Sequence, residues 1–386
     1  MSFSTEFTAK ELLRYSKQIA LPNIGESGQK RLKSAKILLI GVGGLGSPAA
    51  LYLAAAGVGQ LGLIEFDTVD ESNLQRQIIY STSDVNKLKV EAAKKRLTDI
   101  NPHIKVKIFN QKAHPENLRE ILPDFDLVLD GSDNFSTRFI LNDACYFANK
   151  PLLSASIQGF SGQMSLFNYA QGPCLRCLYP SQPPSDYFPN CSEAGVLGPV
   201  AGVMGTLLAS EALKFALGLL PPDGYVLNYD ALNLKFSKIK LNKSESCSLC
   251  SPNANHRLLF EQGNIVQQAD ERSCIGEFIE EAIDAEKLAK NIKDFLLIDV
   301  REDRERALGE ITPSIHLPLN KIENLEAAGF KDLFQINKPI VLYCQTDLRS
   351  KKALVLFKEA RLKQKNHQKG FYLKGGYLAW LKYQSL

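Results

Sequence analysis

The chain has 386 residues, enough for two or three domains with large cores. Its 45% hydrophobic and 23% charged content is ordinary for a globular protein, and a net charge of +4 is too small to indicate a nucleic-acid partner. The longest uncharged run, 17 residues from Ala194 to Ser210, is rich in glycine and predicts a loop with a buried helix rather than a membrane span. With no signal peptide in the first residues, we expect a cytoplasmic protein without a membrane partner, whose eight cysteines stay reduced.

Residues 8–33 predict an amphipathic helix, a break from Pro22 to Gly28 and a short second helix. Arg14 lies in the first helix, and the residues around it favour an ordinary solvated arginine.

A buried strand, Lys36 to Ile40, then runs into a turn with four glycines and a helix of small residues. These glycines form a nucleotide-binding pattern: Gly41, Gly43, Gly44 and Gly46. Glycine permits the positive φ and the close backbone approach that a phosphate group needs at a helix N-terminus. Glu65, at the end of a second strand from Leu61 to Phe66, is placed to bind a ribose hydroxyl. The motif by itself leaves nicotinamide, flavin and ATP open.

The segment from Asp67 to Gln77 is polar and predicts a loop over the carboxyl ends of the strands, where open α/β sheets bind ligands. This loop offers three polar side chains: Asn73, Gln75 and Arg76. Lys89 opens the helix that follows. A later strand, Phe125 to Asp130, presents Asp130 and Asp133 at its carboxyl end, where they could hold a metal–phosphate group. Equally, Asp133 could cap the next helix.

Two cysteine pairs follow further strands predicted at 152–156 and 162–169. The pairs are Cys174 with Cys177, and Cys247 with Cys250. Four thiolates in two CxxC pairs match the tetrahedral ligand set of structural zinc, and we expect that metal here. Cys191 lies between the pairs in a proline-flanked loop, as either an ordinary loop cysteine or a nucleophile.

Residues 251–272 are polar and predict a linker, after which a second domain begins near Cys274. Its strand from Pro339 to Tyr343 runs into Cys344 and a tight loop that opens a helix. Loop amides, the helix N-terminus and Arg349 all favour a thiolate at Cys344, although a buried structural thiol is the alternative. The five histidines are scattered away from these thiols, which argues against an acyl-transfer triad.

Residues 8–250 resemble the ubiquitin-activating-type adenylyltransferases, above all those that serve molybdopterin synthase and the thiamine pathway. The resemblance rests on the two cysteine pairs and on short matching stretches at residues 14–19, 41–46, 67–69, 72–77, 89 and 130–134. Residues 273–384 resemble a rhodanese domain through Asp299-Val-Arg-Glu, the Cys344 loop, Gly375-Gly and Trp380. We therefore expect an α/β fold in which residues 1–250 form a Rossmann-like ATP-binding domain, 251–272 a linker and 273–386 a smaller rhodanese domain.

The resemblance implies a role for each site residue. Glu65 would bind ribose, and Asn73, Arg76 and Lys89 would bind ATP phosphates. Asp133 would hold Mg²⁺ beside Asn134. Arg14 would reach the nucleotide of a partner subunit, which implies a homodimer, and Cys191 matches a crossover-loop cysteine that is covalently involved in some members. The rhodanese part departs from its family where Glu310 replaces the usual histidine.

The implied activity is ATP-dependent adenylation of the C-terminal glycine of a small ubiquitin-like sulfur carrier with a Gly-Gly end, of the molybdopterin-synthase type. Cys344 would then pass a persulfide sulfur, loaded by an upstream donor such as a cysteine desulfurase, to give the carrier thiocarboxylate. Three alternatives stand beside it: a thiamine-pathway carrier as substrate, a rhodanese domain that only binds proteins, and a nicotinamide dehydrogenase.

Overall fold

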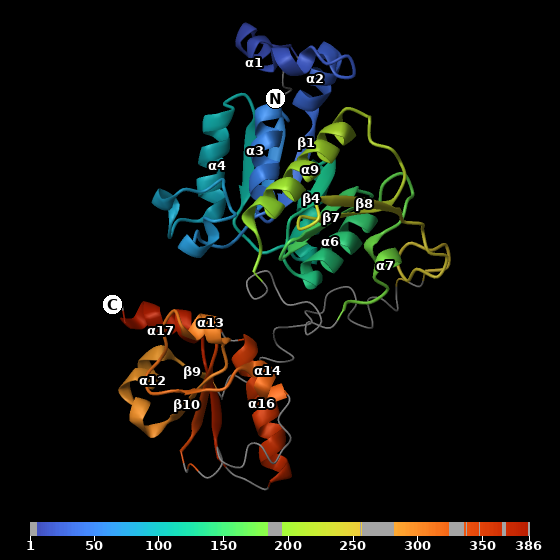
Figure 1. Cartoon of the computed structure of the whole chain (residues 1–386). Coiled ribbons are helices and arrows are strands. Elements are labelled where there is room, and N and C mark those ends of the chain that lie inside the picture. Colours follow the sequence, from blue (N-terminus) through green and yellow to red (C-terminus); the bar gives the residue numbers. More distant parts are fainter. Residues whose placement is uncertain are drawn as a thin grey trace. The chain divides into compact units, whose positions relative to one another are not determined.

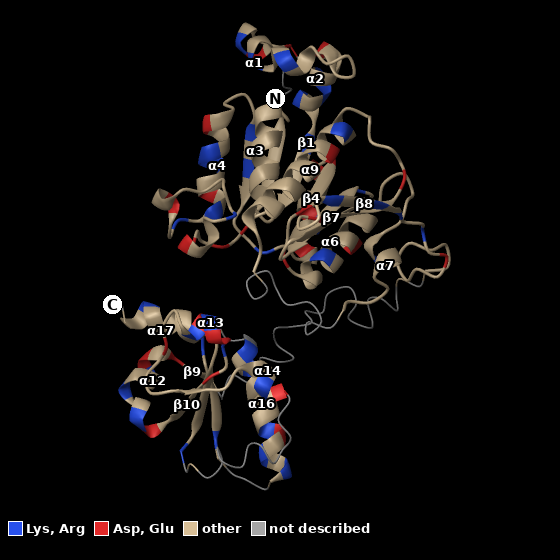
Figure 2. Cartoon of the chain, in the orientation of Figure 1, with Lys and Arg blue, Asp and Glu red and all other residues tan. Residues whose placement is uncertain are grey.

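The structure is a computed structural model, and it describes residues 6–183, 195–254, 256, 282–323, 336, 338–346, 348–364 and 368–384 (Figure 1). The chain divides into two compact units, Met1–Gln267 and Gln268–Leu386. Basic and acidic side chains are interspersed over both units rather than gathered in one field (Figure 2). Among the described helices, none has both the length and the apolar character that a membrane span requires.

The first unit is built on an eight-stranded sheet in the order β3-β2-β1-β4-β5-β6-β7-β8. Strands β1 to β5 are parallel, and β6 to β8 continue the sheet in antiparallel fashion. The strands are β1 (Lys36–Ile40), β2 (Gln60–Ile64), β3 (Lys105–Phe109), β4 (Leu127–Asp130), β5 (Leu152–Gln158), β6 (Ser161–Phe167), β7 (Tyr225–Asp230) and β8 (Lys235–Lys240). All of the strands predicted in this part of the chain form, and the predicted and observed ends differ by no more than a few residues.

Helices cover both faces of this sheet. They are α1 (Ala9–Ile19), α2 (Gly25–Ser34), α3 (Gly46–Ala56), α4 (Lys89–Ile100), α5 (Pro115–Ile121), α6 (Phe135–Phe147), α7 (Leu175–Leu178) and α9 (Gly198–Ala216), with 3-10 turns η1 (Glu71–Asn73), η2 (Thr82–Asp84) and η3 (Leu122–Asp124). The predicted buried helix forms as α9, which begins within the glycine-rich uncharged run and continues beyond it.

Strand β1 shows why the sheet has a core on each side. Alternate side chains of a strand point to opposite faces. Ile37 and Leu39 join the cluster beneath α3, α4 and α9, whereas Leu38 and Ile40 join the cluster beneath α5 and α6. A strand buried on both faces in this way is typical of the parallel sheet of an α/β protein.

The second unit contains a five-stranded parallel sheet in the order β11-β10-β12-β13-β9. Its elements are β9 (Ala282–Ile283), α12 (Ala285–Lys290), η6 (Ile292–Asp294), β10 (Leu296–Asp299), α13 (Asp303–Arg306), β11 (Ile315–His316), α14 (Leu319–Glu323), β12 (Ile340–Tyr343), α16 (Leu348–Lys363), β13 (Gly370–Leu373) and α17 (Gly376–Gln384). Residues of β12 alternate between two clusters, with Leu342 on the side of α14 and α16 and Tyr343 on the side of α17; Cys344, directly after the strand, joins the cluster of Leu342.

Candidate functional sites

The glycine turn after β1 is shaped by close backbone contacts. Gly41 has a φ of +82°, a conformation that favours glycine. A Cβ at Gly46 would lie 2.1 Å from the Gly41 carbonyl oxygen, so any side chain there would force the turn apart. The turn therefore leaves the N-terminus of α3 bare of side chains, as a phosphate cradle requires.

Glu65 fastens this turn to the end of β2. Its carboxylate is buried and accepts hydrogen bonds from the amides of Val42 (3.1 Å), Phe66 (2.9 Å) and Asp67 (3.1 Å). Oε1 accepts two of these bonds and Oε2 only one, so Oε2 keeps a lone pair with which the predicted ribose contact is compatible. Tyr80 adds a hydrogen bond from its hydroxyl to the Val42 carbonyl at 3.0 Å, a support that the sequence did not suggest.

Two of the predicted phosphate ligands lie near the turn. The Arg76 side chain packs over Gly44, since a Cβ built there would be 3.6 Å from Arg76 Cγ, and its guanidinium donates to the Ser72 carbonyl. Lys89 is buried at the start of α4, and its Nζ lies 3.1 Å from a carboxylate oxygen of Asp67.

The neighbouring polar residues, Asn73 and Gln75, lie at the end of a 3-10 turn and in the loop directly after it. Asn73 closes the 3-10 turn η1. Gln75 lies against the start of α9, because a Cβ at Gly198 would be 2.5 Å from its carbonyl oxygen. The structure thus places the polar loop between the turn and α9.

The loop after β4 reaches the same edge of the sheet, because β1 and β4 are parallel neighbours with Ile40 opposite Asp130. Asp130 is fully buried and accepts from the Ser132 amide, the Ser132 hydroxyl and the Ser154 hydroxyl, at 2.9, 2.6 and 2.6 Å. Asp130 therefore holds the loop in shape, whereas Asp133 is exposed at its tip.

The residue that caps α6 is Asn134, whose side-chain oxygen accepts from the Thr137 amide at 2.8 Å. The alternative in which Asp133 caps this helix is therefore wrong, and the Asp133 carboxylate does not perform that task. Its exposed oxygen donors beside a phosphate cradle suit a hard cation such as Mg²⁺.

Arg14 lies away from these residues. Its guanidinium donates to the Ile100 carbonyl, 2.8 Å away, at the end of α4. Helix α1 packs at the C-terminal end of α3, where Asn101 bonds both Tyr15 and the Ala54 carbonyl. The glycine turn lies at the opposite end of α3, so Arg14 does not join the turn of its own chain.

The two cysteine pairs come together as the sequence predicted. The four sulfur atoms all lie within 4.8 Å of one another, with Cys174–Cys247 at 3.5 Å and Cys177–Cys250 at 3.3 Å. Tetrahedral zinc with bonds of about 2.3 Å requires sulfur atoms roughly 3.8 Å apart, so these residues fit the metal. The hydrogen bond with the Cys174 thiol is the largest influence on both neighbours. It lowers the pKa of Cys177, to about 6, and it lowers the pKa of Cys247.

A buried ion pair supports this cluster. Arg176, between the first two cysteines, donates from Nε and Nη2 to the two carboxylate oxygens of Asp143 on α6, at 2.9 and 2.6 Å. Burial raises the pKa of Asp143 by more than these hydrogen bonds lower it. The cluster is therefore tied to the face of the sheet that α6 covers.

In the second unit, Cys344 directly follows β12 and is almost fully buried. The Ser350 hydroxyl lies 3.7 Å from the Cys344 sulfur, and the Cys344 carbonyl accepts a hydrogen bond from the Tyr377 amide at 2.8 Å. The Arg349 guanidinium is paired with a carboxylate: its two terminal nitrogens each lie 2.6 Å from a carboxylate oxygen of Glu305 on α13. The sequence reading missed Glu305, because the two residues are 44 positions apart and no motif links them.

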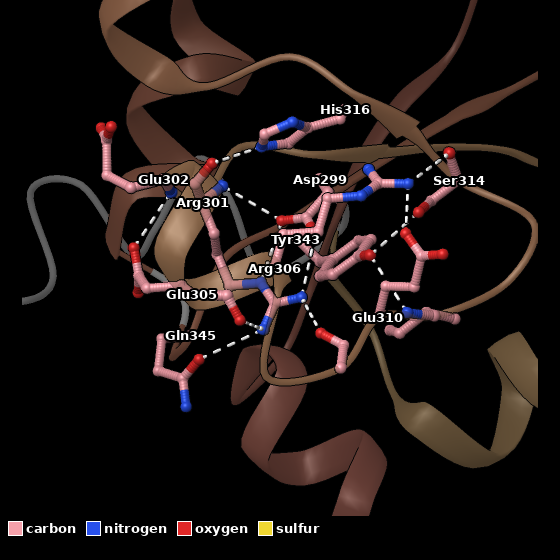
Figure 3. A network of polar contacts seen from close by, with 12 residues as sticks. Asp299, Arg301, Glu302, Glu305, Arg306, Glu310, Ser314, His316, Tyr343 and Gln345 are labelled. Atoms are coloured by element: carbon pink, nitrogen blue, oxygen red, sulfur yellow. Dashed lines mark hydrogen bonds and ion pairs between the residues drawn. The ribbon is translucent and has the colours of Figure 1, made fainter.

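A polar network beneath the loop centres on Arg301 (Figure 3). Arg301 is fully buried, forms a bidentate pair with Asp299 at 3.0 and 2.8 Å, and contacts Gln345 of the loop at 3.4 Å. Glu310, which stands in place of the usual histidine, pairs with Arg306. This ion pair holds the segment around Glu310, and the backbone on either side of Glu310 contacts the network: the Gly309 carbonyl accepts from Arg301, and the Ile311 amide donates to the Tyr343 hydroxyl.

Together these features define a class of protein: an α/β protein with a glycine turn that suits a nucleotide, a four-cysteine cluster that fits a metal, and a second unit with a thiol directly after a strand. Family models agree with this class. Residues 15–249 match the ThiF family, and residues 284–383 match the rhodanese-like domain.

The chain belongs to the ThiF family and carries a rhodanese-like domain after it. It is similar to the probable adenylyltransferase/sulfurtransferase MoeZ of Mycobacterium tuberculosis, with 36% identity over 98% of this chain and 95% of that protein. It is also 38% identical to the adenylyltransferase and sulfurtransferase MOCS3 of Xenopus laevis, over 82% of this chain and 72% of that protein. A sulfur carrier protein adenylyltransferase of Thermus thermophilus is 44% identical over 66% of this chain and 96% of its own length.

Among solved structures, E. coli MccB with MccA-N7isoASN has the same fold, with a TM-score of 0.55, 22% identity, and coverage of 65% of this chain and 77% of that one. The chain is thus an enzyme, an ATP-using adenylyltransferase with a sulfurtransferase unit, as the sequence predicted. Membership of the ThiF family rules out the alternative of a nicotinamide dehydrogenase. Cys191 and most of the predicted linker lie outside the described residues.

Proposed function

We propose that this enzyme adenylates the C-terminal glycine of a small ubiquitin-like sulfur carrier and then converts it to a thiocarboxylate. The observation that carries the proposal is the meeting of the glycine turn, Glu65 and the Asp133 loop at one edge of the sheet, in a chain that also holds the Cys344 loop. The MOCS3 and MoeZ relatives, whose names join adenylyltransferase to sulfurtransferase, support the pairing of the two activities.

In the first step a carrier carboxylate oxygen attacks the α-phosphorus of ATP, and pyrophosphate leaves. A carboxylate is already a nucleophile, so the step requires positioning and charge neutralisation rather than a general base. Arg76 and Lys89 supply positive charge, and Arg14 of a second subunit would add more in a homodimer. Asp133 would hold Mg²⁺, which neutralises phosphate charge when bound.

In the second step Cys344 carries a sulfane sulfur, received from a persulfide donor such as a cysteine desulfurase. The terminal sulfur attacks the acyl carbon, and AMP leaves. A second thiol, for which Cys191 is the candidate in this chain, then attacks the sulfur of Cys344; the S–S bond to the acyl group breaks and the thiocarboxylate leaves. This step leaves a disulfide between the second thiol and Cys344, which an external thiol reductant must reduce before the next turnover. The four-cysteine cluster would hold structural zinc and takes no part in these steps.

The test is carrier-dependent exchange of pyrophosphate into ATP. Asp133→Ala should abolish the exchange, while Asp124→Ala, which removes an exposed carboxylate paired with Lys107, should leave it unchanged. Exchange at the wild-type rate in Asp133→Ala would refute the metal assignment. Offering carriers of the molybdopterin and thiamine types in parallel identifies the substrate.

The sulfur step is tested by the intact mass of the carrier. Cys344→Ala should preserve pyrophosphate exchange but yield no thiocarboxylate when a persulfide is the sole sulfur source. Cys274→Ala serves as the matched control. Full conversion by Cys344→Ala would show that the rhodanese-like unit is a binding module rather than a catalyst.

A further inference from the structure

The structure assigns to Glu305 the choice of sulfur donor: its carboxylate neutralises Arg349 and so favours a persulfide over the thiosulfate dianion. This inference rests on the proposed sulfur transfer and names the donor class that the Cys344 loop accepts.

Arg349 is the basic residue closest in sequence to Cys344 within the loop and the start of α16. Glu305 holds its guanidinium in a bidentate pair in which both nitrogen–oxygen distances are 2.6 Å. The two side chains are only 22% and 24% exposed, so the pair is largely shielded from solvent. Paired in this geometry, the guanidinium presents little net positive charge to an incoming anion.

The other cations near the loop also have partners. Arg301, which contacts Gln345, pairs with Asp299, and its Cζ lies 4.0 Å from the centre of the Tyr377 ring. Lys351 lies over the Tyr372 ring, and Lys352 pairs with Glu323. Each basic side chain described here at the start of α16 is therefore engaged.

Thiosulfate and a persulfide make different electrostatic demands on a loop whose cations are already paired. With thiosulfate, the Cys344 thiolate attacks the outer sulfur, the S–S bond breaks, and sulfite leaves with the electron pair, so two negative charges must enter and leave the loop. With a persulfide R–S–SH, the thiolate attacks the terminal sulfur, R–S⁻ leaves and the proton stays on the new persulfide. In this protonated donor the reacting sulfur atoms carry no charge, so a persulfide depends far less than thiosulfate on a free cation.

Glu305 also has a local task, which decides the substitution to use. Its Oε2 accepts from the Glu302 amide at 3.0 Å at the start of α13. Glutamine at this position keeps an acceptor for that amide and removes only the charge. Glu305→Gln therefore frees Arg349 while preserving the helix start.

The experiment measures kcat/KM of the full chain for thiosulfate, by thiocyanate formed from cyanide, and for freshly prepared cysteine persulfide, by mass of the loaded chain. Glu305→Gln should raise kcat/KM for thiosulfate on the order of tenfold, as expected when one negative charge is removed beside a dianion. The value for cysteine persulfide should change by less than about twofold. The gain should shrink as ionic strength rises.

Two controls separate charge from structure. Glu310→Gln removes an equal charge that pairs with Arg306 instead, and it should leave the ratio of the two donors unchanged. In Glu305→Gln/Arg349→Met the gain for thiosulfate should vanish, because the freed guanidinium is gone. Pyrophosphate exchange, measured on each variant, should stay at the wild-type value.

Equal changes for both donors, or no gain for thiosulfate in a folded Glu305→Gln, would overturn the inference. A wild-type chain that accepts sulfur from neither donor would instead contradict the proposed sulfur transfer. The two failures are therefore distinguishable.

Discussion

The buried pair of Arg176 and Asp143 should be essential to the cysteine cluster, and Arg176→Met tests this. The two side chains are 2% and 3% exposed, so the variant leaves a carboxylate buried without its counter-charge. Breaking such a pair typically costs about 3–5 kcal/mol. For a unit of this size each kcal/mol lowers the melting temperature by roughly 2–4 °C, so we expect a loss of roughly 6–20 °C.

Calorimetry of the full chain measures this loss, and hydrogen exchange of peptides from α6 and from the Cys174–Cys177 segment locates it. The deficit should fade on acidification, because a carboxyl whose pKa is raised by burial is costly only when it is ionised. Arg176→Met/Asp143→Leu should recover part of the stability, since it removes the orphaned charge as well. Lys107→Met, which breaks an exposed pair, is the control and should change little.

Two results would contradict this expectation: Arg176→Met melts at the temperature of the wild type, or the double variant loses as much stability as Arg176→Met and Asp143→Leu lose separately when their losses are added. Either result would mean that the pair does not act as a buried unit.

Three further predictions follow from the geometry. Chelation should remove one zinc per chain and destabilise the first unit, while the fluorescence of Trp380, the only tryptophan, should show the second unit unchanged. Gly46→Ala should abolish stabilisation by ATP, because its Cβ would lie 2.1 Å from the Gly41 carbonyl oxygen; Gly202→Ala, with no atom within 4 Å, is the control. Burial raises the pKa of Glu305, but hydrogen bonds from Arg349 outweigh it and leave the pKa below its ordinary value of 4.5. Its contribution to stability is thus present above pH 4.5 and lost as the pH falls, so the difference in unfolding free energy between wild type and Glu305→Gln should shrink in acid.

Much of this protein could be read from local sequence. The glycine turn, the two CxxC pairs and the thiol at a strand end are short patterns whose chemistry depends on neighbouring residues, and the structure forms each of them. The helix α9 could likewise be predicted, because a glycine-containing uncharged run of that length suits a buried helix better than a membrane span.

Other features depend on contacts between distant segments, and sequence spacing does not reveal them. Asp130 and Asp133 are alike in sequence, yet one is buried under three hydrogen bonds and the other is exposed, because only Asp130 lies within reach of Ser154 on the neighbouring strand. Glu305 meets Arg349 because α13 and the start of α16 converge at the same edge of the parallel sheet. The sequence by itself determined which residues can do chemistry, and the tertiary structure decided which charges they face, since electrostatic interactions depend on distance in space and not along the chain.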